Sequence, residues 1–556
     1  MQPRHYRFWP KNLPTHLTYP RTSLYYNLDV SAARYPDKRF VIYYDTPLTF
    51  HDTKAQVDAL AGYLQQQCGV KRGDRVLLFM QNSPQFILAF YAILRADAMV
   101  VPINPMNLTE ELSHYVSDAD ASVIITGQEL YPQVKPLIGA GGLQHAVVAA
   151  YSDYVTEPTD LNLPDAVRAP RQLIADAGVA LWSNALGAGL MPGPHLAEPD
   201  DLCVMPYTSG TTGKPKGCIH THATVMSTLV SGSYWFNVTP DTTLLGTLPL
   251  FHVTGMQGYM NQPLFTGATV VLMSRWDRDT AAQLIERYRI TSWTNISTMA
   301  IDFLANPKLS EYDISSLARI GGGGAAMPEA VAQRLKDLTG LDYVEGYGLS
   351  ETIAPTHINP PDRAKKQCLG IPICDTDARV INPDTLAELG VGEVGEIVSS
   401  GPQIFKGYWK NPEATAACFI EIDGKRFFRT GDLGYYDEEG YFFIVDRLKR
   451  MINASGYKVW PAEVEAILYG NPHVQEACII STSDSLRGET VKALIVLKPA
   501  SRSAVSADEI IAWCRNHMAA YKIPRVIEFA ETLPKSATGK VQWRLLQERE
   551  KQKTTA

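Results

Sequence analysis

Residues 207–217 read YTSGTTGKPKG and hold three glycines, two lysines and four Ser or Thr side chains. The glycines lack Cβ atoms, so backbone N–H groups can approach phosphate oxygens, while the hydroxyls add donors and Lys216 adds positive charge. A solvated linker is the alternative, although a linker rarely follows an apolar run as closely as this stretch follows residues 202–206. The ATPase pattern G-x-x-x-x-G-K-[ST] cannot be written across it. We therefore predict a phosphate-binding loop of another kind.

A second stretch, residues 345–352, reads EGYGLSET. It offers an aromatic face for a purine, a carboxylate for Mg²⁺ and a hydroxyl for a phosphate, although a turn at a strand end would explain it equally well. Upstream, residues 321–328 read GGGGAAMP. Four successive glycines lose extra backbone entropy on folding, and the close approach of a ligand would explain them.

Three single residues further along the chain suit the same ligand. Asp432 could accept hydrogen bonds from a ribose diol, and Arg447 could donate to that sugar or to a phosphate. Lys540 ends the stretch LPKSATGK at residues 533–540. Taken singly, each is more typical of a turn, a surface ion pair or a solvated loop.

Together and in this order, these stretches resemble the signatures of the adenylate-forming superfamily, which comprises acyl-CoA synthetases, peptide-synthetase adenylation domains and firefly luciferase. The resemblance spans approximately residues 25–544 and is nearest to the fatty acid–CoA ligase branch. It implies an α/β fold with a large N-terminal domain, residues 1–446, that binds ATP and the acyl substrate. This domain has parallel sheets flanked by helices and a small β-barrel-like subdomain. Residues 447–556 are then a small mobile α+β domain.

The resemblance also implies chemical roles. Lys540 bridges the acid's carboxylate and the α-phosphate, and a mobile point charge on a long stem suits that task. His252 gates the acid's carboxylate, although it could equally be a packed imidazole at a strand end. Glu351 and Thr352 complete the implied catalytic set, and Glu351 and Thr208 are the implied magnesium ligands.

The implied nucleotide and CoA site is larger. Its residues are Thr208, Ser209, Gly210, Thr211, Thr212, Gly213, Lys216, Gly324, Ala325, Glu345, Gly346, Tyr347, Gly348, Thr352, Asp432, Arg447, Lys449, Gly456 and Tyr457. Lys449 occupies the family's hinge position, and Gly456 and Tyr457 lie in the segment that admits the pantetheine arm of CoA.

The hydrophobic pattern predicts alternating strands and helices in the large domain. Apolar runs predict strands at residues 75–80, 99–103, 121–125, 268–273 and 291–294. Ser83 caps a helix that Pro84 opens, and further helices are expected at residues 279–289 and between Pro328 and Gly340. Residues 149–199 form a surface excursion with Trp182 as its single large anchor. Hairpins follow residue 388, and a strand at 492–497 and a helix at 507–518 belong to the small domain.

The composition limits the partners. A net charge of −7 and a pI near 6.0 provide no basic field for nucleic acid. The eight cysteines form no C-x-x-C pair, which favours reduced thiols and a cytoplasmic protein. The most hydrophobic region, residues 86–103, is interrupted by Arg95, Asp97 and Pro102, so no membrane span is expected and peripheral contact stays open. Monomer and homodimer are both compatible.

We therefore predict an ATP-dependent acid–CoA ligase that uses ATP, Mg²⁺ and CoA and acts on a medium- or long-chain fatty acid. Three alternatives stay open: an aryl-acid–CoA ligase of the coumarate or benzoate kind, an adenylation enzyme that loads a carrier protein, and a non-catalytic nucleotide-binding scaffold. Asn453, where luciferases carry lysine, argues against oxygenation. The candidate acyl-pocket walls are Trp235, Phe236, Met256, Gln257, Gly258, Gly322, Gly323 and Ala354. No cation stands out among them, which disfavours dicarboxylic acids.

Overall fold

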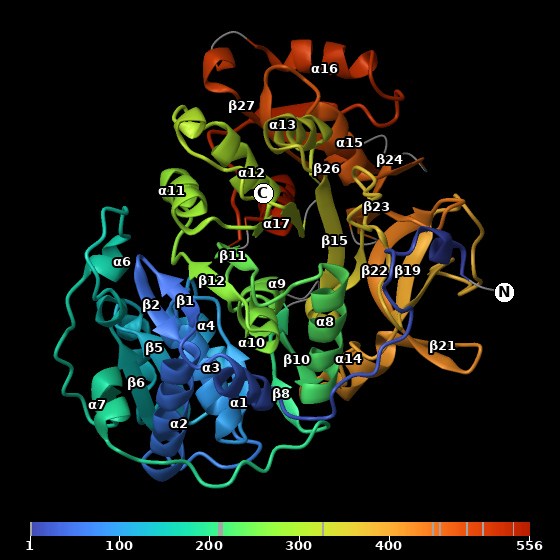
Figure 1. The fold of residues 1–556 in the computed structure, drawn as a ribbon. Coiled ribbons are helices and arrows are strands. Elements are labelled where there is room, and N and C mark those ends of the chain that lie inside the picture. Colours follow the sequence, from blue (N-terminus) through green and yellow to red (C-terminus); the bar gives the residue numbers. More distant parts are fainter. Residues whose placement is uncertain are drawn as a thin grey trace.

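Two large sheets that share one helical layer form the body of the molecule (Figure 1). This computed structural model describes residues 3–208, 215–324, 327–447, 450–454, 457–484, 488–502, 505–536 and 539–555. The first sheet has the order β17-β16-β15-β14-β13-β11-β12-β1-β2. Its strands are β1 (Arg39–Tyr43), β2 (Thr46–Thr49), β11 (Thr243–Gly246), β12 (Thr269–Leu272), β13 (Ser292–Asn295), β14 (Arg319–Gly323), β15 (Tyr343–Leu349), β16 (Ala354–Ile358) and β17 (Ile371–Pro372). Its centre, from β1 to β15, is parallel.

The second sheet has the order β20-β10-β8-β4-β3-β5-β6-β7, and β9 pairs with β10. Its strands are β3 (Arg75–Phe79), β4 (Met99–Pro102), β5 (Val123–Gly127), β6 (His145–Ala149), β7 (Val179–Leu181), β8 (Leu202–Val204), β9 (Tyr207–Thr208), β10 (Lys216–Thr221) and β20 (Gly407–Tyr408). The strands from β8 to β7 are parallel. Carboxyl ends of parallel strands are where α/β sheets bind ligands.

Helices cover both sheets. They are α1 (Tyr25–Arg34), α2 (Phe50–Gln66), α3 (Pro84–Arg95), α4 (Thr109–Asp118), α5 (Tyr131–Val134), α6 (Asp165–Arg168), α7 (Trp182–Gly187), α8 (His222–Trp235), α9 (Val253–Met256), α10 (Gln262–Thr266), α11 (Arg278–Tyr288), α12 (Ser297–Leu304), α13 (Glu329–Thr339) and α14 (Pro412–Ala417). The π-helical turn η4 (Gln257–Asn261) joins α9 to α10. Helix α3 is apolar all round, as a helix buried on every side must be. A single core containing α3 therefore joins the two sheets.

A third, antiparallel sheet follows, with the order β18-β19-β22-β21 and with β23 paired to β22. Its strands are β18 (Asp377–Ile381), β19 (Gly395–Ser400), β21 (Phe419–Ile422), β22 (Lys425–Tyr436) and β23 (Phe442–Arg447). It curls into an open half-barrel beside the parallel sheets (Figure 1). The predicted hairpins after residue 388 are therefore confirmed, and so is the predicted small β-barrel-like subdomain.

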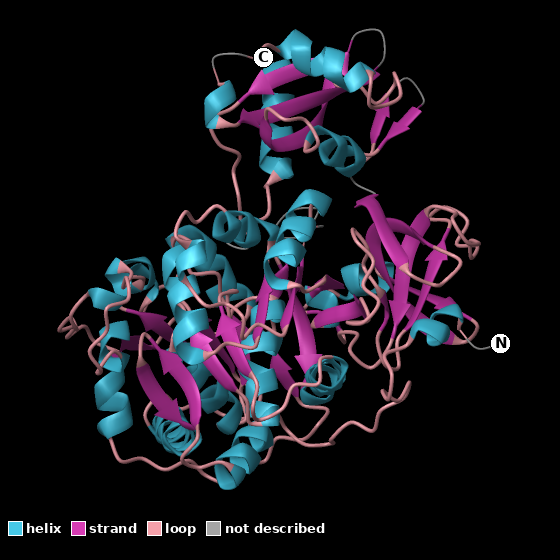
Figure 2. Cartoon of the chain, turned by 45° about the horizontal axis from the view of Figure 1, so that its top comes forward, coloured by secondary structure: helices cyan, strands magenta, loops and turns pink. Residues whose placement is uncertain are grey.

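The C-terminal residues form a separate lobe above the body (Figure 2). Its sheet contains β24 (Ile452–Ala454), β25 (Tyr457–Val459), β26 (Val474–Asp484), β27 (Gly488–Leu497) and β28 (Val526–Phe529). Its helices are α15 (Pro461–Leu468), α16 (Ala507–Arg515) and α17 (Trp543–Thr555). A core of its own lies between the sheet and the helices. The α/β architecture with a small α+β lobe is as predicted, while the boundary between residues 446 and 447 stays a prediction.

Local signals predicted the helix ends well. The Ser83 hydroxyl accepts a hydrogen bond from the Phe86 amide, 3.2 Å away, and Pro84 is the first residue of α3. Gly340 ends α13 in the left-handed region, at φ 73°, whereas Pro328 is the N-cap of α13 and not its first residue. The view of Trp182 as the single anchor of residues 149–199 was wrong, because Tyr151 is fully buried as well.

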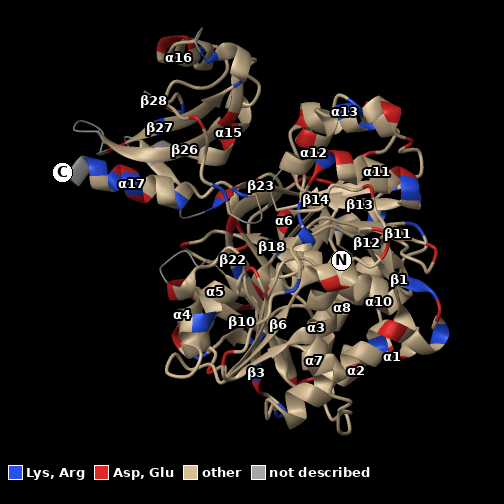
Figure 3. Cartoon of the chain, turned by 90° about the vertical axis from the view of Figure 1, so that its left-hand side faces the viewer, with Lys and Arg blue, Asp and Glu red and all other residues tan. Residues whose placement is uncertain are grey.

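Charged side chains of both signs alternate over the outer helices α11, α13, α16 and α17, and no basic face is visible in this view (Figure 3). All eight cysteines are free. None of the helices in the described ranges is both long and apolar enough to cross a bilayer.

Candidate functional site

The strands that carry the predicted motifs converge between the two parallel sheets. A pocket there is lined by Pro102, Ile103, Asn104, Tyr115, Pro206, Tyr207, Phe251, His252, Val253 and Ser350. Most of these residues come from the end of β4 or from the loops that follow β4, β8, β11 and β15, while Tyr115 lies on α4, Tyr207 on β9 and Val253 at the start of α9. The folding of the sheets thus brings His252 beside the start of the phosphate loop and the end of the second motif.

Three strands hold an aromatic ring, a carboxylate and a guanidinium together. The Tyr347 hydroxyl donates a hydrogen bond to Asp432 Oδ2 at 2.6 Å, and Arg447 Nε lies 2.8 Å from Asp432 Oδ1. Asp432 and Arg447 face each other in the register of β22 and β23. Asp432 is only 1% exposed. Its charge raises the pKa of Arg447, and burial followed by the same charge raises the pKa of Tyr347 well above its usual value.

Glu351 and Thr352 lie in the short turn after β15, and both are buried. Glu351 Oε1 accepts a hydrogen bond from the Tyr408 hydroxyl at 2.8 Å, and burial raises the pKa of Glu351. Lys216 Nζ stands 4.7 Å from the centre of the Tyr408 ring. In the antiparallel pair of β9 and β10, Thr208 is the partner of Lys216. Tyr408 therefore connects the base of the phosphate loop to the second motif.

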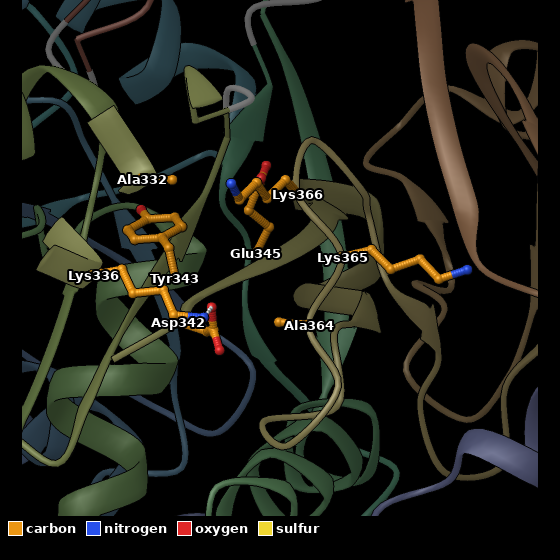
Figure 4. A pocket seen from close by; sticks show the side chains of 8 residues that line it. All are labelled: Ala332, Lys336, Asp342, Tyr343, Glu345, Ala364, Lys365 and Lys366. Atoms are coloured by element: carbon orange, nitrogen blue, oxygen red, sulfur yellow. Dashed lines mark hydrogen bonds and ion pairs between the residues drawn. The ribbon is translucent and has the colours of Figure 1, made fainter. Parts of the chain in front are cut away.

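Glu345 lies two residues before Tyr347 on β15 and lines a separate pocket. Burial raises the pKa of Glu345 to about 7, although its two oxygens accept hydrogen bonds from the Gln367 and Met327 amides at 2.9 and 3.3 Å. The pocket is lined by Ala332, Lys336, Asp342, Tyr343, Glu345, Ala364, Lys365 and Lys366. In Figure 4 the Lys365 side chain points away from Glu345. Its Nζ donates a hydrogen bond to Asp437 Oδ2 at 2.6 Å. Glu345 thus has no lysine as an ion-pair partner within the described ranges.

Lys540 reaches the body of the molecule from the small lobe. A Cβ atom placed on Gly324 would lie 3.2 Å from Lys540 Cε and 3.6 Å from Lys540 Nζ. Burial and, to a lesser extent, the nearby Lys540 charge together lower the pKa of His252 to about 4. Burial and the Arg447 charge lower the pKa of Lys540, while Asp432 opposes them. Lys540 is therefore close to Gly324, His252 and the Asp432–Arg447 pair.

A tight turn presents this lysine. The Ser536 amide donates to the Lys540 carbonyl and the Gly539 amide donates to the Ser536 carbonyl, both at 2.8 Å. Gly539 has φ 76°, which favours glycine, and a Cβ atom there would lie 2.6 Å from Ile296 Cδ1. The missing side chain of Gly539 therefore lets the turn rest against the loop before α12.

Part of the predicted set lies outside the described residues. This part comprises Ser209, Gly210, Thr211, Thr212, Gly213, Ala325, Lys449 and Gly456. Tyr457 is described through its backbone in β25. Gly346 and Gly348 are both on β15, and a Cβ atom on Gly348 would lie 2.6 Å from the Ala354 carbonyl oxygen. The structure thus brings together His252, Gly324, Tyr347, Asp432, Arg447 and Lys540, with Glu351 and Lys216 joined through Tyr408.

Sequence reasoning missed two supporting residues. Tyr408 orients the Glu351 carboxylate, and buried His220 contacts the Ser350 carbonyl oxygen through Nε2 at 2.8 Å. The segment around Tyr408 was interpreted only as hairpin sequence. Its partner is 57 residues away, so no local pattern could have identified the contact.

Comparisons with known proteins agree with this geometry. The family profile described as "AMP-binding enzyme" matches residues 28–409, and "AMP-binding enzyme C-terminal domain" matches residues 463–540. A long-chain-fatty-acid–CoA ligase of Bacillus subtilis (strain 168) is 36% identical over 550 residues, which are 98% of this chain and 97% of that protein. A feruloyl-CoA synthase of Amycolatopsis sp. is 34% identical over 500 residues, 89% of this chain and 92% of that protein.

Among solved structures, ATP-bound MatB from Rhodopseudomonas palustris superimposes with a TM-score of 0.83 at 25% identity and covers 95% of this chain and 99% of its own. The chain belongs to the AMP-binding, adenylate-forming enzyme family. Within that family it is one of the AMP-forming acid–CoA ligases. The predicted family and enzyme class are therefore confirmed.

Proposed function

We propose that this protein is an ATP-dependent fatty acid–CoA ligase that works through an acyl-adenylate. The observation that carries the proposal is the meeting of Lys540, from the small lobe, with Gly324, His252 and the Asp432–Arg447 pair of the body. Such a meeting places one mobile cation where a carboxylate and a nucleotide phosphate would join. ATP binding is further supported by the solved structure of the ATP-bound relative.

In the first half-reaction, a carboxylate oxygen of the acid attacks the α-phosphorus of ATP. A bond forms between that oxygen and phosphorus, the bond to the bridging oxygen breaks, and pyrophosphate leaves. Tyr347 stacks on the purine, and Asp432 accepts hydrogen bonds from the ribose hydroxyls. Lys540 and the loop lysine Lys216 neutralise the charge that develops on the phosphates, which is the task of preorganised cations in phosphoryl chemistry.

The residues around Glu351 fit a magnesium ion. The Glu351 carboxylate is 8% exposed, and no lysine or arginine of the described residues lies within ion-pair distance. A site with one carboxylate suits Mg²⁺, which prefers few protein ligands and substrate phosphate oxygens. When bound, the ion would supply charge neutralisation to the phosphates. Glu351 would hold it, oriented by the Tyr408 hydroxyl, and Thr208 at the base of the loop is the second proposed ligand.

In the second half-reaction, the small lobe turns about Lys449 and withdraws Lys540, and CoA enters past Gly456 and Tyr457. The CoA thiolate attacks the acyl carbonyl, a thioester bond forms, and AMP leaves. The neutral state of His252, whose pKa burial lowers to about 4, leaves an uncharged ring beside the reacting carbonyl. Two chemically different steps then use one pocket, because a lobe movement changes what lines it.

The fatty-acid assignment rests on the name of the Bacillus relative and on the apolar set of predicted pocket walls. An aryl-acid ligase is the second candidate, and the feruloyl-CoA synthase relative at 34% identity supports it. Alkyl and aryl acids differ in width, so the pocket that accepts one class well should discriminate against the other.

The test is a panel of alkyl and aryl carboxylic acids assayed separately for pyrophosphate release and for loss of the CoA thiol. We expect both signals with fatty acids and weak signals with aryl acids. Stronger signals with aryl acids would support the second candidate. Pyrophosphate release without thiol loss would indicate a carrier-loading enzyme, and silence in both assays would indicate a non-catalytic scaffold. Each of these last two outcomes contradicts the proposal.

A further inference from the structure

Strand β14 begins at an arginine and ends just before Gly324, the glycine next to Lys540. Arg319 is its first residue, Gly323 is its last, and Gly324 follows next to Lys540. Side chains alternate along a strand, so Arg319, Gly321 and Gly323 share one face. Apart from Arg319, this face of β14 therefore bears no side chain. A Cβ atom on Gly321 or Gly323 would lie 2.4 Å from the carbonyl oxygen of Val344 or Gly346, so the face is bare by necessity.

The end of α8 and the π-helical turn η4 cover that face. Arg319 Nη1 donates to the carbonyl oxygen of Phe236, the residue that ends α8, at 2.6 Å. The Arg319 guanidinium also lies 4.5 Å from the centre of the Phe236 ring. Tyr259 of η4 accepts a hydrogen bond from the Thr294 amide on β13 at 3.1 Å. The strip between these helical segments and the bare face of β14, from Gly324 next to Lys540 to Arg319, is called the corridor below.

Empty space adjoins this corridor. A Cβ atom on Gly258, also in η4, would meet no atom within 4 Å. On the Arg319 face of β14, Gly323 and Arg319 are partly accessible and Gly321 is buried, and Phe236 beside Arg319 is partly accessible.

The guanidinium of Arg319 has donors to spare. Its Nε and Nη2 donate to the Ser292 hydroxyl at 3.1 and 2.7 Å, which with the Phe236 contact accounts for three of the five N–H groups of an arginine. No carboxylate of the described chain forms an ion pair with it. Burial lowers the pKa of Arg319 to about 10. An interior cation without a counter-charge is costly, so an acceptor oxygen arriving there would be stabilised.

We propose that Arg319, at the far end of the bare face of β14, is a specificity-determining residue: it limits the length of an acyl chain that extends along this face from Lys540, and it favours acids with an oxygen acceptor at the distal end. This inference rests on the proposed function and names its substrate class. From Arg319 to Gly324 the strand spans roughly 16 Å, the length of a medium-chain acyl group. This proposal adds a cation to the predicted apolar pocket walls, and no local pattern indicates it because Phe236, which Arg319 contacts, is 83 residues away in the chain.

The experiment separates charge from length with two substitutions. Arg319→Met keeps most of the length and removes the charge, whereas Arg319→Ala removes both. The substrates are saturated acids of increasing length, with the ω-hydroxy and ω-carboxy forms of the medium-chain members, and the measurement is kcat/KM for pyrophosphate release.

We expect the unaltered protein to prefer an ω-oxygenated acid over the methyl-ended acid of equal length by roughly tenfold or more. Arg319→Met should abolish that preference and leave the length limit, and Arg319→Ala should also extend activity to longer saturated acids. A stronger response to the ω-carboxy form indicates an anion as the distal group, and a stronger response to the ω-hydroxy form indicates a neutral acceptor. Unchanged profiles in both variants would overturn the proposal.

A second variant keeps the inference testable if the arginine variants fail to fold. Gly258→Leu fills the open space of the corridor and should reduce activity on the longer acids roughly tenfold or more, while KM for ATP stays the same. Gly187→Leu is the matched control. A Cβ atom on Gly187 would also meet no atom within 4 Å, but Gly187 lies on α7, away from β14. Equal profiles for both leucine variants would contradict the corridor. Absence of pyrophosphate release with every acid would instead refute the proposed function itself.

Discussion

The two sides of the candidate site are built differently. Tyr347 stands on β15, Asp432 and Arg447 stand on the paired strands β22 and β23, and the three side chains hold one another through two contacts of 2.6 and 2.8 Å. Lys540 stands on a turn of the small lobe whose backbone hydrogen bonds, so far as the described residues show them, stay within the turn and its flanks. The first group is held by strands of two sheets of the body, while the lysine is held by the position of its lobe.

This difference implies that the two groups act in different sets of enzyme states. A group that is fixed on strands can serve every state of the enzyme, because its geometry does not depend on the small lobe. A group that arrives with the lobe can serve only the state in which the lobe is docked. Replacing one or the other should therefore produce different kinetic patterns, and this is how the comparison can be tested.

The largest effect is expected from Lys540→Ala. Loss of this cation should slow adenylation by roughly 10²–10³, by analogy with the loss of a preorganised donor at a developing charge. Thioester formation from supplied acyl-adenylate should stay nearly unchanged. Lys535→Ala is the control, since Lys535 lies on the same segment and pairs with Glu476 at 2.7 Å. Equal loss of both half-reactions in Lys540→Ala would contradict a role that depends on the lobe.

A smaller effect on both half-reactions is expected from Asp432→Asn. Removal of the charge weakens contacts to Arg447 and to the ribose, and hydrogen bonds to charged groups contribute about 1.5–3 kcal/mol. We expect kcat/KM for ATP to fall roughly 10- to 150-fold, and binding of acyl-adenylate to weaken by a similar factor. Tyr347→Phe keeps the ring and the Asp432 charge and should cost less. If Asp432→Asn affected adenylation alone, the fixed group would not serve both states.

The smallest effect on activity is expected at Glu129, whose titration changes only the stability of the scaffold. Burial raises the pKa of Glu129 from 4.5 to about 7, and the Tyr151 hydroxyl donates to Glu129 Oε1 at 2.9 Å. The folded protein thus holds this proton more tightly than the unfolded chain. The stabilisation is complete below pH 4.5 and is lost as the pH rises to about 7.

Glu129→Gln removes that dependence. Relative to the variant, the unaltered protein should lose about 3 kcal/mol of unfolding free energy between pH 4.5 and pH 8. The check is the difference in thermal midpoint between the two proteins at pH 5 and at pH 8. A difference that is the same at both values would show that Glu129 titrates normally. Adenylation at pH 8 should be equal in the two proteins, since Glu129 is not part of the proposed site.

Several features could be predicted from residues that act locally. The Ser83 cap, Pro84 at the start of α3 and Gly340 after α13 follow from the backbone chemistry of those residue types, and the structure has all three. The alternation of apolar runs also predicted the parallel strands. The predicted strand at residues 121–125 is observed as β5, Val123–Gly127, because its pairing with β3 and β6 sets the bounds.

Contacts across long separations could not be predicted in this way. Tyr408 reaches Glu351 and Arg319 reaches Phe236 only because different strands and helices pack side by side. The hydrogen-bond partner of a hydroxyl or a guanidinium need not be near it in the sequence. The residues next to it in the chain therefore do not indicate which partner it has. For the same reason, Tyr151 gave no sign of being an anchor.

By itself, the sequence determined the alternation of strands and helices, the positions of the caps and the order of the motifs, because these depend on each residue's own backbone preferences and on the spacing of apolar side chains. Only the tertiary structure decided which motif side chains meet, that Arg319 contacts Phe236, and that Lys540 approaches Gly324. The reason is physical: burial and Coulomb energy depend on distances in space, and separation along the chain does not fix these distances.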